Sequence, residues 1–600
     1  MLFRASRNRT VLAAKGLKVG RAGAPSVGYE LKKGEQVHNQ DGQERQVNPY
    51  EEIAKKAHGA SGGIDPDLLP YLAEADREER IDLPISDNLA DQQDSERLRA
   101  ALQAGGIALP EEIVGSETAP EEENPENSRD NSTPAMAMDS PTSDESLQAD
   151  FEVAQVYARI LSRRPEYKIS PTKARIERAL DYLSDPQLSY PSLHIAGTNG
   201  KTSTARIADS LLSAQGLRVG RFTSPHLVSV RERISIDGEP ISPQAFLQAN
   251  QDVEPIIALA DKQGESAGQG RLSFFEYLTA LAFQAFASAP IDVGVIEVGM
   301  GGRWDSTNVL DSAVQVICPI SFDHEKWLGS TLTEIAGEKA GIIRPGATVI
   351  CGPQEVEALE VIREVCREKN ATLRLYGEDF TVSEQKMAVG GQMFTLTTPA
   401  ASYQDLYLPL FGNHQAVNAA LAITAVEALG AGKVLSEEVL AAGLDAARSP
   451  GRLEVLGGSP TVIVDAAHNP AGAAALRSGI EDAFGFQKVV GVFSAMGDKN
   501  VEGILAEMEP MLDAVVTLPM EGERAMEPVE LAKIAGEVFG SEQTFAAPNL
   551  LDAVDQAVSL TEEGNLPADA VGIVIFGSVV LAGQARQLLS GRLKPENNSH

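Results

Sequence analysis

The segment from His194 to Leu212, HIAGTNGKTSTARIADSLL, combines glycines, a lysine and hydroxyl side chains in the manner of a phosphate-binding loop. An apolar strand is predicted to lead into the glycine turn, and Lys201 and Thr202 are predicted to begin a helix with apolar residues at helical spacing. Backbone N–H groups from Gly197 onward are expected to face a polyphosphate, and the helix dipole adds to the attraction. We expect Lys201 to reach the β- and γ-phosphates and Thr202 to bind Mg²⁺.

The spacing of this loop departs from the usual Walker pattern, G-x-x-x-x-G-K-[ST]. Ile195 stands where that pattern places its first glycine, and Gly197 lies only three positions before Gly200. The loop alone leaves three interpretations open: a degenerate nucleotide loop, a glycine turn without function, or another family's version of the same device.

Polar residues end several of the predicted apolar strands. Four such strand ends carry Thr223-Ser224, Glu297, Asp323-His324 and Asp465. Because ligands gather at the carboxyl ends of parallel strands, we expect these residues to converge on one sheet edge. A carboxylate in a buried strand needs a partner, and a metal ion is a suitable one. Taken singly, each residue also has a structural explanation, such as a turn cap or a core histidine.

Alternating strand and helix patterns predict an α/β fold with a doubly wound parallel sheet. Amphipathic helices begin at Phe151, and a second β–α series follows a break at ARSPGRLEVLGGSP. We therefore predict a P-loop ATP-binding domain over residues 151–448 and a smaller, Rossmann-like α/β domain over residues 449–600. The hydrophobic fraction of 43% over 600 residues is sufficient for these cores.

Residues 1–150 are predicted to form a largely disordered, acidic extension. The stretch from Glu111 to Asp150 holds twelve acidic residues and one basic residue, with proline, serine and asparagine throughout. Such a composition cannot bury enough apolar area to offset the entropy of ordering.

Composition also excludes some classes of partner. The net charge of −34 argues against a nucleic-acid-binding protein, which needs a basic surface. No segment is long and apolar enough to span a membrane, and the 3 cysteines share no metal-ligand spacing. A cytoplasmic location is expected. The basic first 29 residues favour a basic tail over a transit peptide.

A series of motifs resembles one family closely. The segments GTNGKTST, TSPHL, IEVGMGGRWDSTN, SFDHEKWLG, GEKAGII, HQAVNAA, PGRLE and DAAHNP occur in this order. Together they resemble folylpolyglutamate synthase/dihydrofolate synthase, within the Mur ligase superfamily, over residues 151–590. A departure is Phe576 in FGS, where the family more often has threonine or cysteine.

The resemblance implies an ATP-dependent acid–amino-acid ligase that joins L-glutamate to folates, and to dihydropteroate, through an acyl phosphate. It implies a triphosphate site at Gly197, Thr198, Asn199, Gly200, Lys201 and Thr202. It implies two Mg²⁺ ions bound by Thr202, Ser224, Glu297 and His324. Residues implied to close over ATP are Asn418, Arg452, Asp465 and His468. Those implied to act in catalysis are Lys201, His324, Lys339 and Arg452.

Other implied features are less specific. Lys339 matches a lysine that the family carbamylates, although by sequence alone it resembles an exposed helix lysine paired with Glu338. Ser273 and Phe275 match a pterin-contacting segment, although an aromatic residue there is more often part of a core. The small-molecule partners implied are ATP, L-glutamate and a folate or dihydropteroate, and a monomer is expected.

Two alternatives remain. A Mur-type ligase acting on a UDP-muramoyl substrate would share the loop, but would carry an N-terminal UDP-binding domain instead of an acidic extension. A P-loop switch protein would use nucleotide to change conformation. A guanine-specific switch needs an Asn-Lys-x-Asp segment, and GDKN, which contains Lys499, does not match it.

Overall fold

The computed structural model describes residues 143–165, 170–522, 524–563 and 566–590. All of these residues belong to one compact unit within residues 57–600. The predicted disorder of residues 1–142 lies outside the described part. Helix α5 (Ser143–Leu161) begins before the predicted domain start at Phe151, so the end of the acidic segment is helical.

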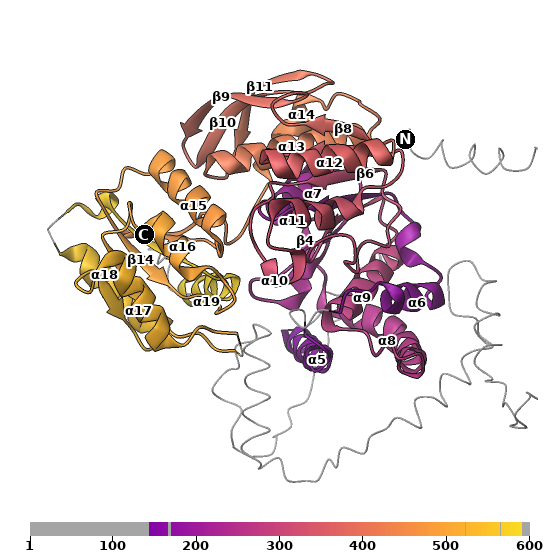
Figure 1. Cartoon of the computed structure of the whole chain (residues 1–600), viewed down its shortest axis with the longest axis horizontal. Coiled ribbons are helices and arrows are strands. Elements are labelled where there is room, and N and C mark those ends of the chain that lie inside the picture. Colours follow the sequence, from indigo (N-terminus) through magenta and orange to yellow (C-terminus); the bar gives the residue numbers. More distant parts are fainter. Residues whose placement is uncertain (1–142, 166–169, 523, 564–565, 591–600) are drawn as a thin grey trace, which may run out of the picture. The chain divides into compact units, whose positions relative to one another are not determined.

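An eight-stranded sheet forms the first half of the described chain, in the order β4-β3-β2-β5-β1-β6-β7-β8 (Figure 1). Its strands are β1 (Ser192–Ala196), β2 (Val219–Phe222), β3 (Ile234–Ile236), β4 (Glu239–Pro240), β5 (Val293–Glu297), β6 (Val314–Ile317), β7 (Thr348–Cys351) and β8 (Thr372–Leu375). All neighbouring pairs from β2 to β8 are parallel, and β3 and β4 add an antiparallel edge.

The register of this sheet aligns the strand ends that carry polar residues. Ile195 of β1 pairs with Glu297 of β5, and Phe222 of β2 pairs with Ile296. Strand β1 lies between β5 and β6; the chain runs from β1 to β2, β3 and β4 on one side, inserts β5 between β2 and β1, and then adds β6, β7 and β8 on the other side. The loop after β1 therefore lies at the topological switch point, where open α/β sheets bind their ligands.

Helices cover both faces of this sheet, as the burial of its central strands on both faces requires. The helices of this half, some of which pack on other helices rather than on the sheet itself, are α5, α6 (Ala174–Tyr182), α7 (Lys201–Ala214), α8 (Pro243–Ser266), α9 (Phe274–Ser288), α10 (Glu325–Leu328), α11 (Leu332–Lys339), α12 (Val356–Glu368), α13 (Asn413–Leu429) and α14 (Glu437–Asp445). Short 3₁₀ turns lie at Pro186–Leu188, Val230–Arg233, Ala340–Ile342 and Ala568–Ala570. Among the described helices, none is long and apolar enough to cross a membrane.

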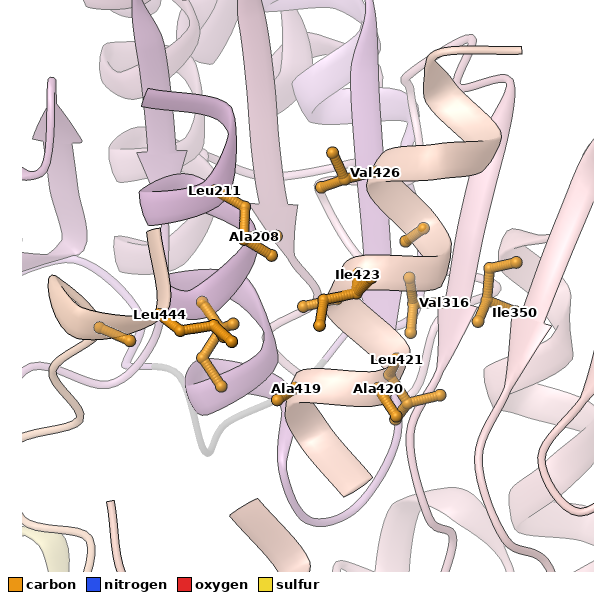
Figure 2. Close-up of a cluster of buried hydrophobic side chains, with 14 of the residues drawn as sticks. Ala208, Leu211, Val316, Ile350, Ala419, Ala420, Leu421, Ile423, Val426 and Leu444 are labelled. Atoms are coloured by element: carbon orange, nitrogen blue, oxygen red, sulfur yellow. The ribbon is translucent and has the colours of Figure 1, made fainter. Parts of the chain in front are cut away.

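Helix α13 is buried along most of its length because it is covered on more than one side. It packs on α7, on β6 and β7, and on a three-stranded antiparallel sheet that the sequence analysis did not predict. That sheet contains β9 (Thr381–Ala388), β10 (Gly391–Thr397) and β11 (Ser402–Leu408). Figure 2 shows side chains of α7 and α13, with Val316 and Ile350 of the large sheet, gathered in one apolar cluster.

A six-stranded sheet forms the second half, in the order β12-β13-β17-β14-β15-β16. Its strands are β12 (Glu454–Gly458), β13 (Thr461–Val464), β14 (Lys488–Phe493), β15 (Ala514–Thr517), β16 (Thr544–Ala546) and β17 (Val571–Phe576). Its helices are α15 (Pro470–Ala483), α16 (Val501–Met508), α17 (Pro528–Phe539), α18 (Leu550–Glu562) and α19 (Val579–Ser590). The predicted α/β class is confirmed, and both sheets are parallel except at one edge, where β12 pairs antiparallel with β13 in the second sheet. The predicted boundary at residue 449 falls between α14 and β12 and stays a prediction.

The cluster between α7 and α13 generates a stability prediction. Leu421 is fully buried there, whereas the side chain of Leu188 is 55% exposed. Leu421→Ala removes buried methyl groups and leaves a cavity, so we expect it to lower the free energy of unfolding by about 2–5 kcal/mol. Leu188→Ala is the matched control, with an expected change below about 0.5 kcal/mol. Urea denaturation followed by circular dichroism measures both, and equal losses would contradict the packing assigned to α13.

Candidate active site

The turn between β1 and α7 is shaped by two glycines that no other residue can replace without strain. Gly197 has a φ of +146°, and a Cβ placed there would lie 2.6 Å from the Cβ of Cys318. Gly200 has a φ of +87°, and its Cβ would lie 2.4 Å from Oδ1 of Asn418. The glycines let β6 and α13 approach the loop closely, and this leaves the N-terminus of α7 facing a cavity.

Two lysine side chains meet at the carbonyl of Gly197. Lys201 Nζ donates to the carbonyl oxygens of Gly197 and Thr198, at 3.1 Å each, and Lys339 Nζ donates to that of Gly197 at 2.8 Å. Lys339 is 5% exposed. Burial, with the positive charge of Lys201 as a smaller cause, lowers the pKa of Lys339 to about 7.

The surroundings of Lys339 decide between the two interpretations of its sequence. Glu338, the partner expected for an exposed lysine, instead pairs with Arg303 at 3.2 Å. Lys339 is buried at the end of α11, where it lines the cavity beside the loop. The interpretation as an exposed lysine paired with Glu338 is therefore wrong.

Thr202, Ser224 and Glu297 form a compact group of oxygen atoms at the ends of three neighbouring elements. Thr202 Oγ1 lies 3.0 Å from both carboxylate oxygens of Glu297, and the backbone N–H of Ser224 donates to Glu297 at 3.3 Å. Glu297 is 1% exposed. Burial raises its pKa, and the charge of Lys201 opposes that rise.

His324 lies at the edge of the same cavity, immediately before α10. Its φ of 53° is in the left-handed region, and its backbone N–H donates to Oδ1 of Asp323 at 2.8 Å. Burial lowers the pKa of the His324 imidazole to about 3, against the opposing charge of Asp323. The ring is therefore neutral at physiological pH and keeps a lone pair for a ligand.

Asp323 accepts hydrogen bonds from several directions. Burial alone would raise its pKa, but the hydrogen bond from His468 and the positive charge of Lys499 hold that pKa well below its usual range. Asp323 is therefore an anion at the cavity wall.

Residues from the second half of the chain line the same cavity, which has a volume of about 330 Å³. The predicted residues among them are Arg452, Asp465 and His468, and the predicted residue Asn418 lines the cavity from α13 of the first half. The expectation that Asp465 lies on the same sheet edge as Glu297 is wrong, because Asp465 follows β13 of the six-stranded sheet. Sequence periodicity identifies a strand but not the sheet that the strand joins.

The Asp465 carboxylate also has a role in the shape of its own loop. Its two oxygens accept the backbone N–H groups of Leu453 at 2.7 Å and Ala467 at 2.6 Å. Burial raises the pKa of Asp465, and the charge of Arg452 opposes this. His468 lies in the same loop, with Nδ1 at 2.8 Å from the carbonyl oxygen of Ala466, which only accepts. Nδ1 therefore carries a proton, and Nε2 points toward Asp323 at 3.4 Å.

The structure does not bring Ser273 and Phe275 into this cavity. Ser273 caps α9, accepting the backbone N–H of Glu276, and Phe275 stacks on Phe222 at a ring distance of 5.7 Å. Phe275 nevertheless packs directly behind Gly299, which lines the cavity. The approach is so close that a Cβ on Gly299 would lie 2.4 Å from the Phe275 ring. Their role as substrate contacts stays a prediction.

Sequence reasoning missed two polar residues at this site, His414 and Gln415, which line the cavity from the first turn of α13. Asp323 was expected at a strand end without a role of its own, and it lines the cavity from the loop after β6. Burial, with the charge of Arg452, lowers the pKa of His414 to about 4. The available signal was the position of polar residues at the N-terminal turn of an otherwise apolar helix.

Among the described residues, no three His, Cys, Asp or Glu side chains gather as a metal cluster. The predicted Mg²⁺ ligands contain only two residues of these types, Glu297 and His324, together with two hydroxyl groups. A buried carboxylate beside hydroxyl oxygens is a donor set that Mg²⁺ prefers. Thr202, Ser224 and Glu297 therefore fit the predicted ion, whereas the nitrogen of His324 is an unusual ligand for it.

Comparisons with known proteins match both halves of the chain. Residues 195–426 match the Mur ligase middle domain, and residues 451–578 match the Mur ligase glutamate ligase domain. The chain is 47% identical over 480 residues to the dihydrofolate synthase/folylpolyglutamate synthase of Mycobacterium tuberculosis, a match that covers 76% of this chain and 99% of that protein.

Solved structures are similar as well. The Mycobacterium tuberculosis folylpolyglutamate synthase complexed with ADP and AMPPCP has a TM-score of 0.70 and 46% identity, covering 74% of this chain and 99% of that one. Escherichia coli FolC in complex with DHPP and ADP has a TM-score of 0.64 and 28% identity, covering 74% of this chain and 98% of that one. The chain belongs to the dihydrofolate synthase/folylpolyglutamate synthase family of Mur-type ligases.

Proposed function

We propose that this chain is an ATP-dependent ligase that adds L-glutamate to folates, and that it also converts dihydropteroate to dihydrofolate. The observation that carries the proposal is the meeting of Lys201 and Lys339 at the carbonyl of Gly197, beside the buried carboxylate of Glu297. Such a site is suited to holding a polyphosphate. Relatives crystallised with ADP, AMPPCP and DHPP support the same substrates.

The proposed reaction has two steps. A carboxylate oxygen of the folate or pteroate attacks the γ-phosphorus, the bond to the bridging oxygen breaks, and ADP leaves. The amine of glutamate then attacks the acyl carbon of the acyl phosphate, phosphate leaves, and the nitrogen loses a proton. Both steps depend on the positioning of the reactants and on the neutralisation of phosphate charge. The positive side chains of Lys201 and Arg452 are proposed to neutralise this charge.

Thr202, Ser224, Glu297 and His324 would hold Mg²⁺, with two ions in the proposed enzyme. When bound, the metal neutralises phosphate charge. The chain's own contribution is a preformed set of ligands: Glu297 is buried and hydrogen-bonded to Thr202, and His324 is held neutral by burial. The triphosphate itself is assigned to the loop residues Gly197, Thr198, Asn199, Gly200, Lys201 and Thr202.

Lys339 is proposed to be carbamylated. Only the free amine reacts with CO₂, and burial keeps a large fraction of this amine free near neutral pH. Carbamylation replaces a buried positive charge by a negative one beside Lys201, whose own charge then stabilises the product. This supports Lys339 as a source of anionic oxygen at the metal site.

Asn418 of α13 and three residues of the second half of the chain are proposed to complete the nucleotide site. Asn418 touches the loop at Gly200, and Arg452, Asp465 and His468 line the cavity opposite it. We keep Ser273 and Phe275 as pterin contacts, because Phe275 supports the cavity wall at Gly299. The domain ranges 151–448 and 449–600 remain part of the proposal.

A monomer in the cytoplasm is also proposed. The cysteines Cys318, Cys351 and Cys366 are buried and unpaired, as is usual in a reducing compartment.

An ADP-release assay tests the function with two carboxylic-acid substrates, each offered with and without the amine substrate glutamate. We expect dihydropteroate with glutamate, and tetrahydrofolate with glutamate, each to give ADP and a product one glutamate heavier by mass spectrometry. UDP-muramoyl peptides are the control for the Mur-type alternative, which the family placement does not favour, and should give no turnover. ADP release that needs neither acid nor glutamate would disprove the ligase assignment.

Loss of the loop lysine provides the second test. Lys201→Ala removes the charge nearest the loop carbonyls, and we expect both ligase activities to fall by at least about 100-fold. Lys433→Ala, at an exposed position, is the matched control and should keep wild-type rates. Survival of either activity in Lys201→Ala would contradict a single site for both reactions.

Carbamylation of Lys339 generates a test with a defined pH dependence. Raising the pH through about 7 converts the ammonium to the free amine, so at equal concentrations of dissolved CO₂ reactivation of CO₂-depleted enzyme should be faster at about pH 8 than at about pH 6. Lys339→Arg keeps a cation but cannot be carbamylated, and should remain inactive under both conditions. Full activity of the wild type in CO₂-free buffer, measured by ADP release, would exclude the modification.

A further inference from the structure

Lys499 forms a buried ion pair with Asp323 that joins the two sheets. Its Nζ lies 2.5 Å from Oδ1 of Asp323, and the two side chains are only 9% and 8% exposed. Lys499 lies between β14 and α16 of the six-stranded sheet, whereas Asp323 follows β6 of the eight-stranded sheet. In the sequence this lysine belongs to GDKN, a motif to which the proposed ligase reaction assigns no role.

The carboxylate that Lys499 pairs with also holds residues on both sides of the cavity. Asp323 Oδ1 accepts the backbone N–H of His324 at 2.8 Å, and Oδ2 lies 3.4 Å from Nε2 of His468. Asn469 Nδ2 approaches the same oxygen at 3.5 Å. One carboxylate thus connects the proposed metal ligand His324 with the loop after β13.

Asn469 extends this network to the phosphate loop. Its side chain exchanges two hydrogen bonds with that of Asn199, at 3.1 and 3.3 Å, and its Oδ1 also caps α15 by accepting the N–H of Gly472 at 2.8 Å. The chain of contacts from Lys499 through Asp323 and Asn469 therefore ends at a residue of the loop that faces the triphosphate.

Stability alone is a weak reason for such a pair. Removing two charges from water costs free energy that their mutual attraction repays only in part, so buried ion pairs often give little net stabilisation. Lys499 is not among the residues lining the cavity, whereas Asp323, His324 and His468 all are. The pair therefore lies one layer behind the site, where a side chain acts by fixing its neighbours.

We propose, resting on the ligase function above, that Lys499 is a positioning residue for the reaction. By pairing with Asp323 it fixes His468 and Asn469 against the phosphate loop and so completes the cavity from the second sheet. Lys499 itself does not contact the substrate. Displacement of such groups by about 1 Å is enough to reduce a reaction rate by about 100-fold.

The test compares Lys499→Met, which removes the charge, with Lys499→Arg, which keeps it. For Lys499→Met we expect kcat to fall by about 10- to 100-fold, while the KM for glutamate and the Kd for ADP change by less than about 3-fold. Lys499→Arg should recover most of kcat. Lys488→Met is the matched control, because Lys488 donates only to carbonyl groups within its own half of the chain, and it should keep kcat within about 2-fold.

A double-mutant cycle with Asp323→Asn separates positioning from general destabilisation. If both changes break the same contact, the double variant should lose no more than the worse single variant. Additive losses would overturn the proposal. So would an unchanged kcat in Lys499→Met, or a rise confined to the KM for glutamate, which would assign the ammonium group to substrate binding.

Hydrogen–deuterium exchange provides a readout that does not depend on the substrate. With ADP bound, amides of residues 466–472 should exchange faster in Lys499→Met than in the wild type or in Lys499→Arg. This result is expected even if the wild type proves inactive with folates, so failure of the proposed function is distinguished from failure of this inference. Unchanged exchange in a folded variant would overturn it, and Lys499→Gln replaces Lys499→Met if the latter melts below the assay temperature.

Discussion

The carbonyl oxygen of Gly197 accepts hydrogen bonds from two lysine side chains, and the arrangement of the site depends on how these positive groups are kept together. Two ammonium ions at such a distance repel each other, and burial increases the repulsion. The chain relieves it by lowering the pKa of Lys339 and by placing the buried carboxylate of Glu297 near Lys201. The charged side chains are therefore compatible with burial only when three elements have come together. These elements are the glycine turn, the end of α11 and the end of β5.

The sequence was sufficient to predict the residues that follow directly from strand and helix periodicity. Lys201, Thr202 and Glu297 lie at the end of a strand or the start of a helix, and parallel strands place such ends at one edge. The sheet membership of Asp465 could not be predicted, because it depends on which strand pairs with β13 far away in the chain. Lys499 and His414 were missed for the same reason, since long-range packing alone brings them near the loop.

The antiparallel sheet of β9, β10 and β11 was also missed, although its effect was visible in α13. A helix that is apolar on all sides must be covered on all sides, and α13 is such a helix in the sequence. The eight-stranded sheet covers one side of it, and the small sheet and α7 cover others. Family resemblance supplied roles for Lys339 and Arg452 that residue patterns alone did not, whereas the burial of Lys339 required the structure.

The left-handed backbone at His324 has a consequence for how this protein tolerates change. A non-glycine residue at a φ of 53° costs about 1 kcal/mol or more relative to glycine. Selection for thermal stability alone would favour glycine at this position and would remove the imidazole at the cavity edge. The chain thus keeps a locally unfavourable conformation at a residue that presents a neutral imidazole to the cavity. Under the proposed function, gains in stability and gains in activity would oppose each other at His324.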